Sequence, residues 1–400
     1  MIKADFLLIG GGIIGISIAR ELKKRYPDSS VCILEKEREC GLHASGRNSG
    51  VLHAGFYYTA DSFKAKFTRD GNQRLTEYCE SKNIKVNKCG KLVVAQNESE
   101  LIWLDELMVR ADKNGVTLES VTEEESKSIE PRVKTFQRAL FSPSTSSVNP
   151  KDLLQAMQSD ASQEGVQICT NAQYLHRKDK KVIQTSSGLF EAGYLINVAG
   201  LYADKIGRDF GFSEDYRILP FKGLYLYSNE PAGSLRTHIY PVPDLANPFL
   251  GVHLTVTVDG KVKLGPTAIP AFWREQYEGW SNFSFNELTE ILLRQAGLFL
   301  SSNFDFKALA FRELQKYSRP KLVSLASSLA KGVNIKNYLQ WGKPGIRAQL
   351  LNIRDKKLEM DFVLEGDGSS IHILNAVSPG FTCALPFAEY VCDQINKKLS

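Results

Sequence analysis

The chain has 400 residues, of which 43% are hydrophobic and 24% charged, with a formal net charge of +5. This length exceeds that of one ordinary domain and predicts two. The charge is dispersed, and the nearest approach to a basic block is the short cluster at 177–181. Nucleic acid is therefore not expected as a partner, whereas a mildly basic surface is compatible with loose peripheral contact to an anionic membrane.

Three glycines near the N-terminus predict a dinucleotide-binding βαβ unit. Gly10, Gly12 and Gly15 follow an apolar run at 6–9 and open a segment with apolar residues at helical spacing. Glycines in this pattern allow a tight turn, close approach of the backbone to a pyrophosphate, and close packing of helix on strand. The helix N-terminus adds N–H groups and a partial positive charge for the phosphates.

A second apolar run, at 31–34, ends on Glu35, twenty residues after Gly15. A carboxylate at this point can accept hydrogen bonds from both ribose hydroxyls, and it would repel a 2′-phosphate. The motif therefore favours the adenosine and pyrophosphate half of NAD or FAD over NADP.

Helices and strands are expected throughout the rest of the chain. The predicted helices begin near Asp61 or Ser62 and at Ser99, Thr122, Pro150, 285 and Pro386, and the predicted strands lie at 166–170, 181–185, 194–200 and 371–375, with a hairpin at 258–261. This order predicts a discontinuous nucleotide-binding domain of residues 1–80, 150–215 and 340–400. A substrate domain of residues 81–149 and 216–339 is inserted into it, and ligands are expected between the two.

Cysteine usage and hydropathy predict the compartment. The seven cysteines are odd in number and contain no CxxC pair, which is typical of a reducing environment. No secretory leader and no apolar run of about 18 residues is evident. We therefore expect a cytoplasmic protein, or one peripheral at a membrane.

The segment 46–58 contains the densest set of candidate functional residues. Its small residues would let the backbone approach a flat ring, and His53 can exchange a proton near neutral pH. Oxidation of an alcohol needs such a proton acceptor beside a hydride acceptor. The alternative is that His53 only packs or hydrogen-bonds within a loop.

Several separated blocks share a pattern with one family of enzymes. They are 47–55, 197–204, 220–223, 238–244, 249–253 with 259–260, 264–266, 345–349 and 374–379. Together they resemble the FAD-dependent oxidoreductases of the D-amino-acid oxidase superfamily, and they are most similar to the L-2-hydroxyglutarate dehydrogenase/oxidase family. The resemblance implies mixed α/β and α+β architecture: a Rossmann-like FAD-binding domain with an inserted substrate domain on a mostly antiparallel sheet.

The resemblance also implies which residues hold FAD. Gly10, Gly12, Gly15 and Glu35 would bind its ADP part. The other implied cofactor-binding residues are Lys36, Ser45, Asn48, Ser49, Gly50, Val51, Gly200, Ser378, Gly380, Phe381 and Thr382. Whether a cysteine such as Cys383 is bonded to the flavin is left open.

The implied substrate is a small dicarboxylic 2-hydroxy acid, oxidised with a quinone or oxygen as final electron acceptor. Such a substrate needs cations for its carboxylates. Arg347 is the foremost candidate because a guanidinium binds a carboxylate in a bidentate manner. Lys222 and His253 are further candidates, each with a structural role as the alternative, and no metal site is predicted. His43 and His372 are expected to be structural, and His176 solvated.

Departures from the family pattern keep the substrate open. Leu224, Thr267 and Pro344 replace an acidic residue, an asparagine and a small residue that relatives commonly have. The alternatives are a glycerol-3-phosphate dehydrogenase, a glycine- or sarcosine-type amine oxidase, or a flavin-binding scaffold without turnover.

Overall fold

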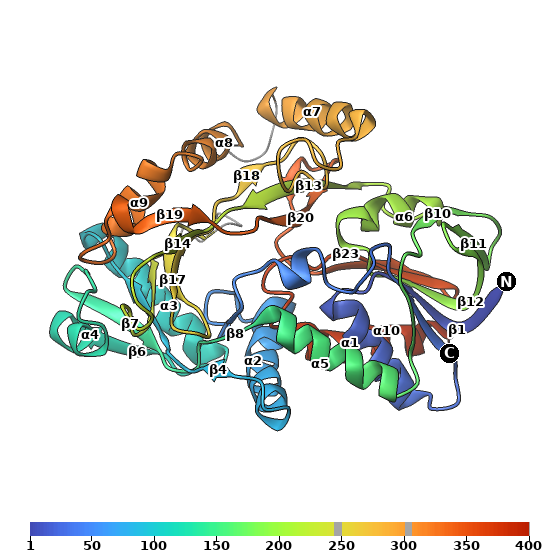
Figure 1. Cartoon of the computed structure of the whole chain (residues 1–400), viewed down its shortest axis with the longest axis horizontal. Coiled ribbons are helices and arrows are strands. Elements are labelled where there is room, and N and C mark those ends of the chain that lie inside the picture. Colours follow the sequence, from blue (N-terminus) through green and yellow to red (C-terminus); the bar gives the residue numbers. More distant parts are fainter. Residues whose placement is uncertain (244–249, 301–305, 400) are drawn as a thin grey trace. The chain divides into compact units, whose positions relative to one another are not determined.

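The computed structural model describes residues 1–243, 250–300 and 306–399, and the chain folds into two compact units (Figure 1). Unit 1 comprises residues 1–48, 150–220 and 347–400, and unit 2 comprises residues 49–149 and 221–346. Asp244 and Phe249, which belong to the family-like blocks, lie outside the described residues.

Unit 1 is built on a sheet whose centre is parallel. Strand β1 lies between β2 and β12 and is parallel to both, and β9 and β23 extend the parallel part. Strands β10, β11 and β22 pair antiparallel. The strands of this sheet are β1 (Ile2–Ile9), β2 (Val31–Leu34), β9 (Gln167–Cys169), β10 (Tyr174–Arg177), β11 (Val182–Thr185), β12 (Gly188–Asn197), β22 (Val363–Gly366) and β23 (Ser370–Asn375).

Helices cover this sheet because its side chains are apolar on both faces. Leu7 and Leu8 of β1 are both fully buried although they point to opposite faces. Helix α1 packs against α5 and α10, and α6 packs against β10, β12 and β23 (Figure 1). The helical elements of unit 1 are α1 (Ile13–Arg25), η1 (Ala44–Gly46), α5 (Pro150–Gln163), η3 (Gly200–Tyr202), α6 (Ala203–Asp209) and α10 (Ala384–Leu399).

Unit 2 contains a large sheet in the order β19-β14-β17-β16-β15-β5-β7-β6. Its neighbours pair antiparallel except β15 and β5. The mostly antiparallel sheet expected from the family resemblance is thus confirmed. The strands are β5 (Lys91–Val94), β6 (Glu119–Thr122), β7 (Arg138–Ser142), β14 (Leu226–Ser228), β15 (His238–Pro241), β16 (His253–Val256), β17 (Val262–Gly265) and β19 (Tyr338–Trp341).

The remaining elements of unit 2 surround this sheet. A small sheet has the order β3-β8-β4. The elements are β3 (Val51–Leu52), α2 (Phe63–Ser81), β4 (Val86–Asn87), η2 (Glu98–Glu100), α3 (Leu101–Lys113), α4 (Glu123–Ile129), β8 (Ser146–Val148), β18 (Ile269–Pro270), α7 (Phe285–Leu300), α8 (Phe306–Gln315), α9 (Arg319–Ser327) and η4 (Ile335–Asn337). The chain changes unit within β13 (Tyr216–Gly223) and β20 (Gly345–Asn352), and β20 pairs with β21 (Lys357–Leu358) in unit 1.

Most predicted elements are confirmed, because the capping signals in the sequence act locally. The hydroxyl of Ser62 accepts from the N–H of Ala65 at the start of α2, and Thr122 and Glu125 form a complete capping box at α4. Helix α7 has the predicted bounds, and β16 and β17 form the predicted hairpin. Within the described residues, no helix is long and apolar enough to cross a bilayer.

Residues 49–80 lie in unit 2, whereas we placed them in the nucleotide-binding domain. Strand β3 pairs with β8, and the amide of Asn72 in α2 donates to the carbonyls of Leu52 and Ser144. Phe56 packs in a cluster with side chains of β5 and α3. These contacts fix the segment to unit 2 from Ser49 onward, and the sequence around Asn48 shows no change of composition that marks the boundary.

The two faces of the large sheet in unit 2 differ in chemistry. Alternate residues such as Leu92, Leu254 and Leu264 join Leu322 of α9 in one apolar cluster. The residues between them on β5, β15, β16 and β17 point to the other face because side chains alternate along a strand. The polar and aromatic ones among them are Lys91, His238, Tyr240, His253, Thr255 and Lys263.

We predict that Leu264→Ala lowers the free energy of unfolding of unit 2 by about 3 kcal/mol, because it leaves a cavity in a packed core. Leu264 is fully buried, whereas Leu339 in β19 is 53% exposed, so Leu339→Ala is the matched control with a loss below about 1 kcal/mol. Urea denaturation followed by tryptophan fluorescence reports on this unit, which contains all four tryptophans. Equal losses in both variants would contradict the assignment of this core.

Candidate active site

The N-terminal glycine turn of unit 1 has no room for side chains at two positions. Gly10 has a φ of +123°, and a Cβ there would lie 2.5 Å from the carbonyl oxygen of Val198. A Cβ at Gly15 would lie 2.1 Å from the carbonyl oxygen of Gly10. Glycine is therefore required for β1, β12 and the start of α1 to come this close.

Two polar side chains converge on this turn. The carboxylate of Glu35, at the end of β2, accepts from the backbone N–H groups of Gly11 and Glu37, each at 2.9 Å. The hydroxyl of Ser45 accepts from the N–H of Ile13 in the first turn of α1 at 2.9 Å. Each carboxylate oxygen keeps a second lone pair, so Glu35 can still accept hydrogen bonds from ribose hydroxyls.

Three other predicted cofactor-binding residues, Lys36, Asn48 and Gly200, lie in or beside turns of unit 1. Lys36 forms an ion pair with Glu37, and Gly200 begins η3 with a φ of +54°. The amide of Asn48 donates to the carbonyls of Ala44 and Ser45 and so holds the turn after η1.

The predicted segment 48–51 crosses the boundary between the units. In unit 2, the hydroxyl of Ser49 accepts from the N–H of Val51 at 3.2 Å, and the carbonyl of Gly50 accepts from the N–H of Val148 at 2.8 Å. The backbone here is therefore held by β8.

The C-terminal predicted segment forms a tight turn before α10. A Cβ at Gly380 would lie 2.2 Å from the carbonyl oxygen of Ala376. Ser378 is exposed, Phe381 is half-buried and Thr382 is fully buried. The turn leads directly into the N-terminus of α10, where backbone N–H groups have no partner within the helix.

These features of unit 1 fit the ADP part of FAD. The glycines leave a close path for a pyrophosphate, the first turn of α1 offers N–H groups to it, and Glu35 ends the neighbouring strand. The donors around the turn are backbone groups and hydroxyls, as expected for binding phosphate and ribose oxygens.

In unit 2, the polar face of the large sheet forms a row of side chains across four strands. Lys91 lies beside His238 in the parallel pair β5–β15. The register of β15 on β16 sets His238 beside Thr255, and Thr255 is opposite Lys263. All four are nearly or fully buried. We call Lys91, His238, Thr255 and Lys263 the cross-strand row.

His53 and His253 lie close to this row. His253 lies on β16 two residues before Thr255, and His53 lies three residues before Phe56, whose ring centroid is 4.4 Å from Nζ of Lys91. The ring of His253 stacks on Tyr240 with 3.6 Å between centroids. The structure thus brings two predicted site residues, His53 and His253, together in one unit.

Hydrogen bonds fix the tautomers of two of these histidines. Nδ1 of His253 lies 2.8 Å from the carbonyl oxygen of Gly251, so it carries the proton and Nε2 is the acceptor. Nδ1 of His238 accepts from the N–H of Val256 at 3.0 Å, so its Nε2 carries the proton and faces Ser147 at 3.3 Å. Both nitrogens of His238 are therefore occupied in holding strands together.

Burial keeps the three imidazoles neutral. It lowers the pKa of His53 and of His238 to about 3, with the charge of Lys91 as the next cause, and lowers that of His253 well below its usual range. Burial also lowers the pKa of Lys91 to about 7 and that of Lys263 to about 8. This face therefore holds neutral imidazoles, which can accept a proton, beside two lysines that lose a proton more readily than an exposed lysine does.

The other predicted substrate residues lie elsewhere in the fold. Lys222 is buried on β13, where that strand pairs with β18, and burial lowers its pKa. The hydroxyl of Thr267 donates to the carbonyl of Lys222 and accepts from the N–H of Leu224, so this departure from the family pattern closes a local turn. Arg347 is half-buried on β20 in unit 1, whereas His53, His238 and His253 belong to unit 2.

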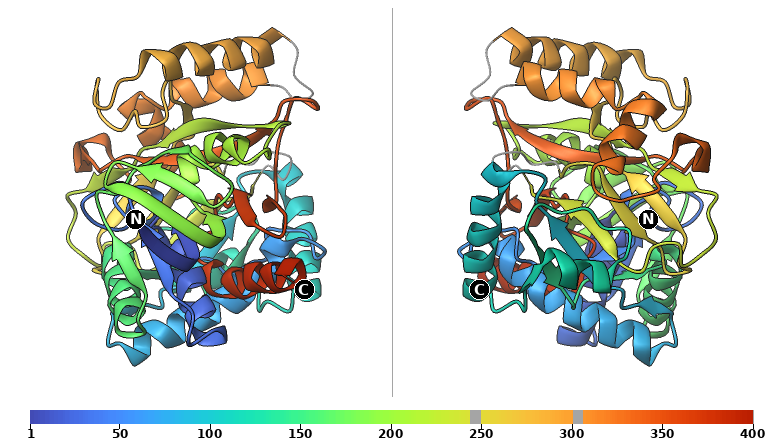
Figure 2. Two further views of the ribbon diagram at one scale, coloured as in Figure 1. Left: turned by 90° about the vertical axis from the view of Figure 1, so that its right-hand side faces the viewer. Right: turned by 90° about the vertical axis from the view of Figure 1, so that its left-hand side faces the viewer.

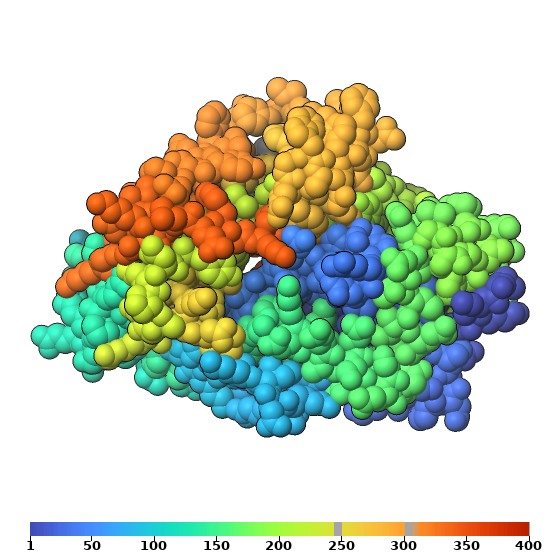
Figure 3. All heavy atoms as spheres, in the orientation of Figure 1, coloured from blue at the N-terminus to red at the C-terminus, as the bar shows by residue number. Residues whose placement is uncertain are grey.

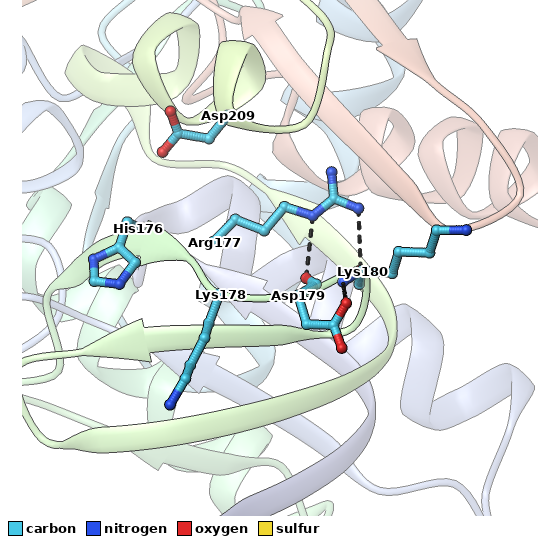
Figure 4. Close-up of a pocket in the computed structure, with 6 residues that line it drawn as sticks. All are labelled: His176, Arg177, Lys178, Asp179, Lys180 and Asp209. Carbon is cyan, nitrogen blue, oxygen red and sulfur yellow. Dashed lines mark hydrogen bonds between the residues drawn. The ribbon is translucent and has the colours of Figure 1, made fainter.

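The remaining histidines have structural or solvated positions. His43 pairs with Glu37, and His372 lies between Asn197 and Ser370 in the core of unit 1. His176 is exposed at the rim of a depression on the β10–β11 hairpin (Figure 4). Arg177 in this depression donates to the carbonyl of Asp179, so its charge serves the hairpin itself.

Sequence reasoning missed Lys91, His238 and Lys263 as functional candidates. Each of the two lysines lies in a short buried strand whose other residues are apolar or glycine: Lys91 in β5 and Lys263 in β17. A lysine inside such a strand is an anomaly, because lysine is rarely buried without a partner. The sequence therefore contained a signal for each lysine separately. Only the register of the strands shows that the two lysines lie in one row.

The chain is similar to known proteins over nearly its whole length. A family model described as FAD dependent oxidoreductase matches residues 5–394. L-2-hydroxyglutarate dehydrogenase of Escherichia coli K12 is 35% identical over 412 residues, which cover 99% of this chain and 94% of the relative. The mitochondrial L-2-hydroxyglutarate dehydrogenase of Homo sapiens is 34% identical over 420 residues, which cover 98% of this chain and 89% of the relative.

Solved structures show the same fold. An L-alpha-glycerophosphate oxidase of Mycoplasma pneumoniae with FAD bound matches with a TM-score of 0.78 and 22% identity, over 99% of this chain and 95% of its own. Glycine oxidase of Geobacillus kaustophilus matches with a TM-score of 0.75 and 19% identity, over 100% and 96%. With a family model that spans nearly its whole length, the chain belongs to the FAD-dependent oxidoreductase family.

Proposed function

We propose that this enzyme oxidises L-2-hydroxyglutarate to 2-oxoglutarate. The observation that carries the proposal is the polar face of unit 2, where neutral histidines and buried lysines lie together. An acid substrate needs cations for its carboxylates, and its hydroxyl needs a neutral base. Relatives named L-2-hydroxyglutarate dehydrogenase, similar over almost the whole chain, support this choice of acid.

His53 is the proposed base for the C2 hydroxyl. It is partly exposed, whereas His238 is fully buried with both nitrogens engaged, so a ligand can reach His53 more readily. The imidazole of His53 is neutral before binding, as a proton acceptor must be. An anionic substrate beside it raises its pKa toward neutrality, which increases its strength as a base at the moment it is needed.

Arg347 is the proposed clamp for one carboxylate, with Lys222 and His253 as further contributors. A guanidinium keeps its charge at all relevant pH values and binds both oxygens of a carboxylate, so it fixes the orientation of C2. FAD, when bound, supplies the acceptor for the hydride from C2. His53 would take the proton of the hydroxyl and FAD would take the hydride from C2. The two electrons lost by the substrate would therefore be gained by FAD.

Unit 1 is the proposed holder of FAD. Gly10, Gly12, Gly15 and Glu35 would contact its ADP part, and the segment Ser378–Thr382 would approach the flavin ring through backbone N–H groups that stabilise negative charge. The other predicted cofactor-binding residues, including Ser45 and Asn48, are proposed to support the same ligand.

We propose a membrane quinone as the electron acceptor, reached through an apolar surface on α7. Phe285, Leu292 and Phe299 recur every seven residues on this helix and are exposed, as are the adjacent Leu293 and Leu300 at 74% and 83%. Helix α7 lies at the surface and contacts α8 (Figures 2 and 3). Monomers rarely expose a continuous apolar stripe of this kind unless it binds a partner or a membrane.

Basic and aromatic groups at its edge suit the proposed membrane surface. The ammonium of Lys307 in α8 lies 5.3 Å from the ring centroid of Phe299, and Trp280, just before α7, is 77% exposed. Tryptophan is favoured at lipid headgroups, and lysine is attracted to anionic lipids.

We predict that Gly15→Ala abolishes FAD binding, because its Cβ would lie 2.1 Å from the carbonyl oxygen of Gly10. The purified variant should lack the visible absorbance of a flavin. Gly297→Ala is the matched control, since a Cβ at Gly297 meets nothing within 4 Å. A Gly15→Ala protein with full flavin content would refute the assignment of this turn to FAD.

We predict that L-2-hydroxyglutarate bleaches the flavin absorbance of the anaerobic protein, whereas glycine, sarcosine and glycerol 3-phosphate do not. His53→Ala should keep the absorbance and slow the bleaching by about 10²- to 10⁴-fold, the usual contribution of a general base. Bleaching by an amine or by glycerol 3-phosphate in place of the hydroxy acid would favour those alternatives. No bleaching by any of them would favour a flavin-binding scaffold.

We predict that the wild-type protein sediments with vesicles of phosphatidylcholine and phosphatidylglycerol, and that Leu293→Glu with Leu300→Glu abolishes this while turnover with a soluble dye persists. Leu175→Glu is the control, because Leu175 in β10 of unit 1 is also exposed. Failure of the wild type to sediment, together with rapid reoxidation by oxygen, would replace the quinone with oxygen as acceptor.

A further inference from the structure

Lys91 is a buried cation without a counter-charge among the described residues. Its side chain is fully buried, and in the same part of the chain its Nζ has no hydrogen-bond partner. Burial is the cause that lowers its pKa, and no carboxylate of the described residues offsets the loss of water around the ammonium. Buried donors of this kind call for a specific explanation, which in many proteins is a ligand.

Three aromatic rings surround this ammonium. Its Nζ lies 4.4 Å from the ring centroids of Phe56 and Tyr57, and 5.0 Å from that of Tyr240. The faces of the rings attract the cation and hold it in one place, but they accept no strong hydrogen bond. The hydroxyl of Tyr57 is a second buried donor that lacks a partner within the described part of the chain. Two neighbouring side chains, Lys91 and Tyr57, thus each have a buried donor without an acceptor among the described residues.

The other buried lysine of the cross-strand row is already engaged. Nζ of Lys263 donates to the carbonyl of Ser49 at 2.9 Å, and lies 4.8 Å from the ring centroid of Tyr225. Three strand intervals separate it from Lys91, or about 14 Å between backbones. The two ammonium groups also face different rings, so Lys91 is the one of the two that lies beside the segment that contains His53.

His53 connects this cation to the reacting part of the substrate. His53 lies three residues before Phe56, one of the rings that contact this ammonium, and after burial the charge of Lys91 is the next cause that lowers the pKa of His53. The other titratable groups that face Lys91 are His238, Tyr240 and His253 of β15 and β16, and Tyr57 of the segment after β3. None of these carries a negative charge at neutral pH, so an added carboxylate would be the first counter-ion.

We propose that the ammonium of Lys91 binds the carboxylate of the substrate that is remote from C2, and so selects dicarboxylic over monocarboxylic 2-hydroxy acids. This assignment rests on the function proposed above. The carboxylate next to C2, which every 2-hydroxy acid has, would be bound by other groups. Lys91 and the Tyr57 hydroxyl then have the acceptor that they lack in the protein alone.

The test compares binding of glutarate and butyrate to the flavin-loaded protein by titration calorimetry. Lys91→Met removes the charge and keeps the volume, and thioethers pack well against aromatic rings. We expect the Kd of glutarate to rise about 10- to 100-fold, as for loss of a charge-assisted hydrogen bond, and the Kd of butyrate to change less than about threefold. Lys91→Arg should restore the preference for glutarate, and Lys85→Met, at an exposed lysine, should leave it unchanged.

Proton uptake gives a second measurement that does not depend on turnover. At pH 8 most Lys91 side chains are neutral, and a bound carboxylate favours the ammonium, so glutarate should take up a proton while butyrate takes up little. Calorimetry in buffers of different ionisation enthalpy measures this. If the Met variant fails to fold, this comparison in the wild type, together with Lys91→Arg, still decides the proposal.

The outcomes separate the two proposals. If the wild type oxidises L-2-hydroxyglutarate and binds glutarate, but Lys91→Met keeps the affinity and the proton uptake, only the Lys91 subsite is wrong. Equal weakening of glutarate and butyrate would also overturn it, because Lys91 would then serve the shared carboxylate or the fold. If the wild type neither oxidises the hydroxy acid nor binds glutarate, both proposals fall.

Discussion

The cost of removing charge from water is the constraint on which the polar face of the large sheet in unit 2 depends. The large sheet of unit 2 buries two lysines and two histidines on the face opposite its apolar core. A buried ammonium without a counter-ion destabilises the fold. The protein limits that cost in two ways: burial shifts the pKa of Lys91 to about 7, and aromatic rings replace part of the lost hydration. The remaining free-energy cost of burying this ammonium would fall if an anion bound beside it.

Backbone packing is the corresponding constraint in unit 1. There the close approach of β1, β12 and α1 depends on glycines that no other residue can replace, with predicted Cβ contacts of 2.5 Å and 2.1 Å at Gly10 and Gly15. The result is a surface of N–H groups and small residues rather than of charges. The two units therefore offer opposite chemistry: unit 1 offers backbone donors suited to a pyrophosphate, and unit 2 offers side-chain cations suited to a small acid. The division matches an enzyme that holds a large cofactor and a small charged substrate by different means.

The sequence predicts local features well, but it predicts poorly which residues make up the polar face of the large sheet. The helix that begins at Ser62, the capping box at Thr122 and the glycine turn were predictable because each depends on residues close in the chain. The cross-strand row was not predictable, because Lys91 and Lys263 lie 172 positions apart in the chain and come into one row only through the pairing register of the strands. The unit boundary after Asn48 was missed for the same reason, since it depends on the pairing of β3 with β8.

The resemblance to a family supplied what local patterns could not, but it drew attention to residues in the family-like blocks. His53 and His253 lie in such blocks, and both belong to unit 2. Lys91 lies outside them, in a strand that looks like ordinary core. Burial lowers the pKa of His53 and keeps its imidazole neutral, and the positive charge of Lys91 lowers that pKa further. In the proposed reaction, a carboxylate bound to Lys91 would cancel this second effect, so the bound substrate would itself make His53 a stronger base.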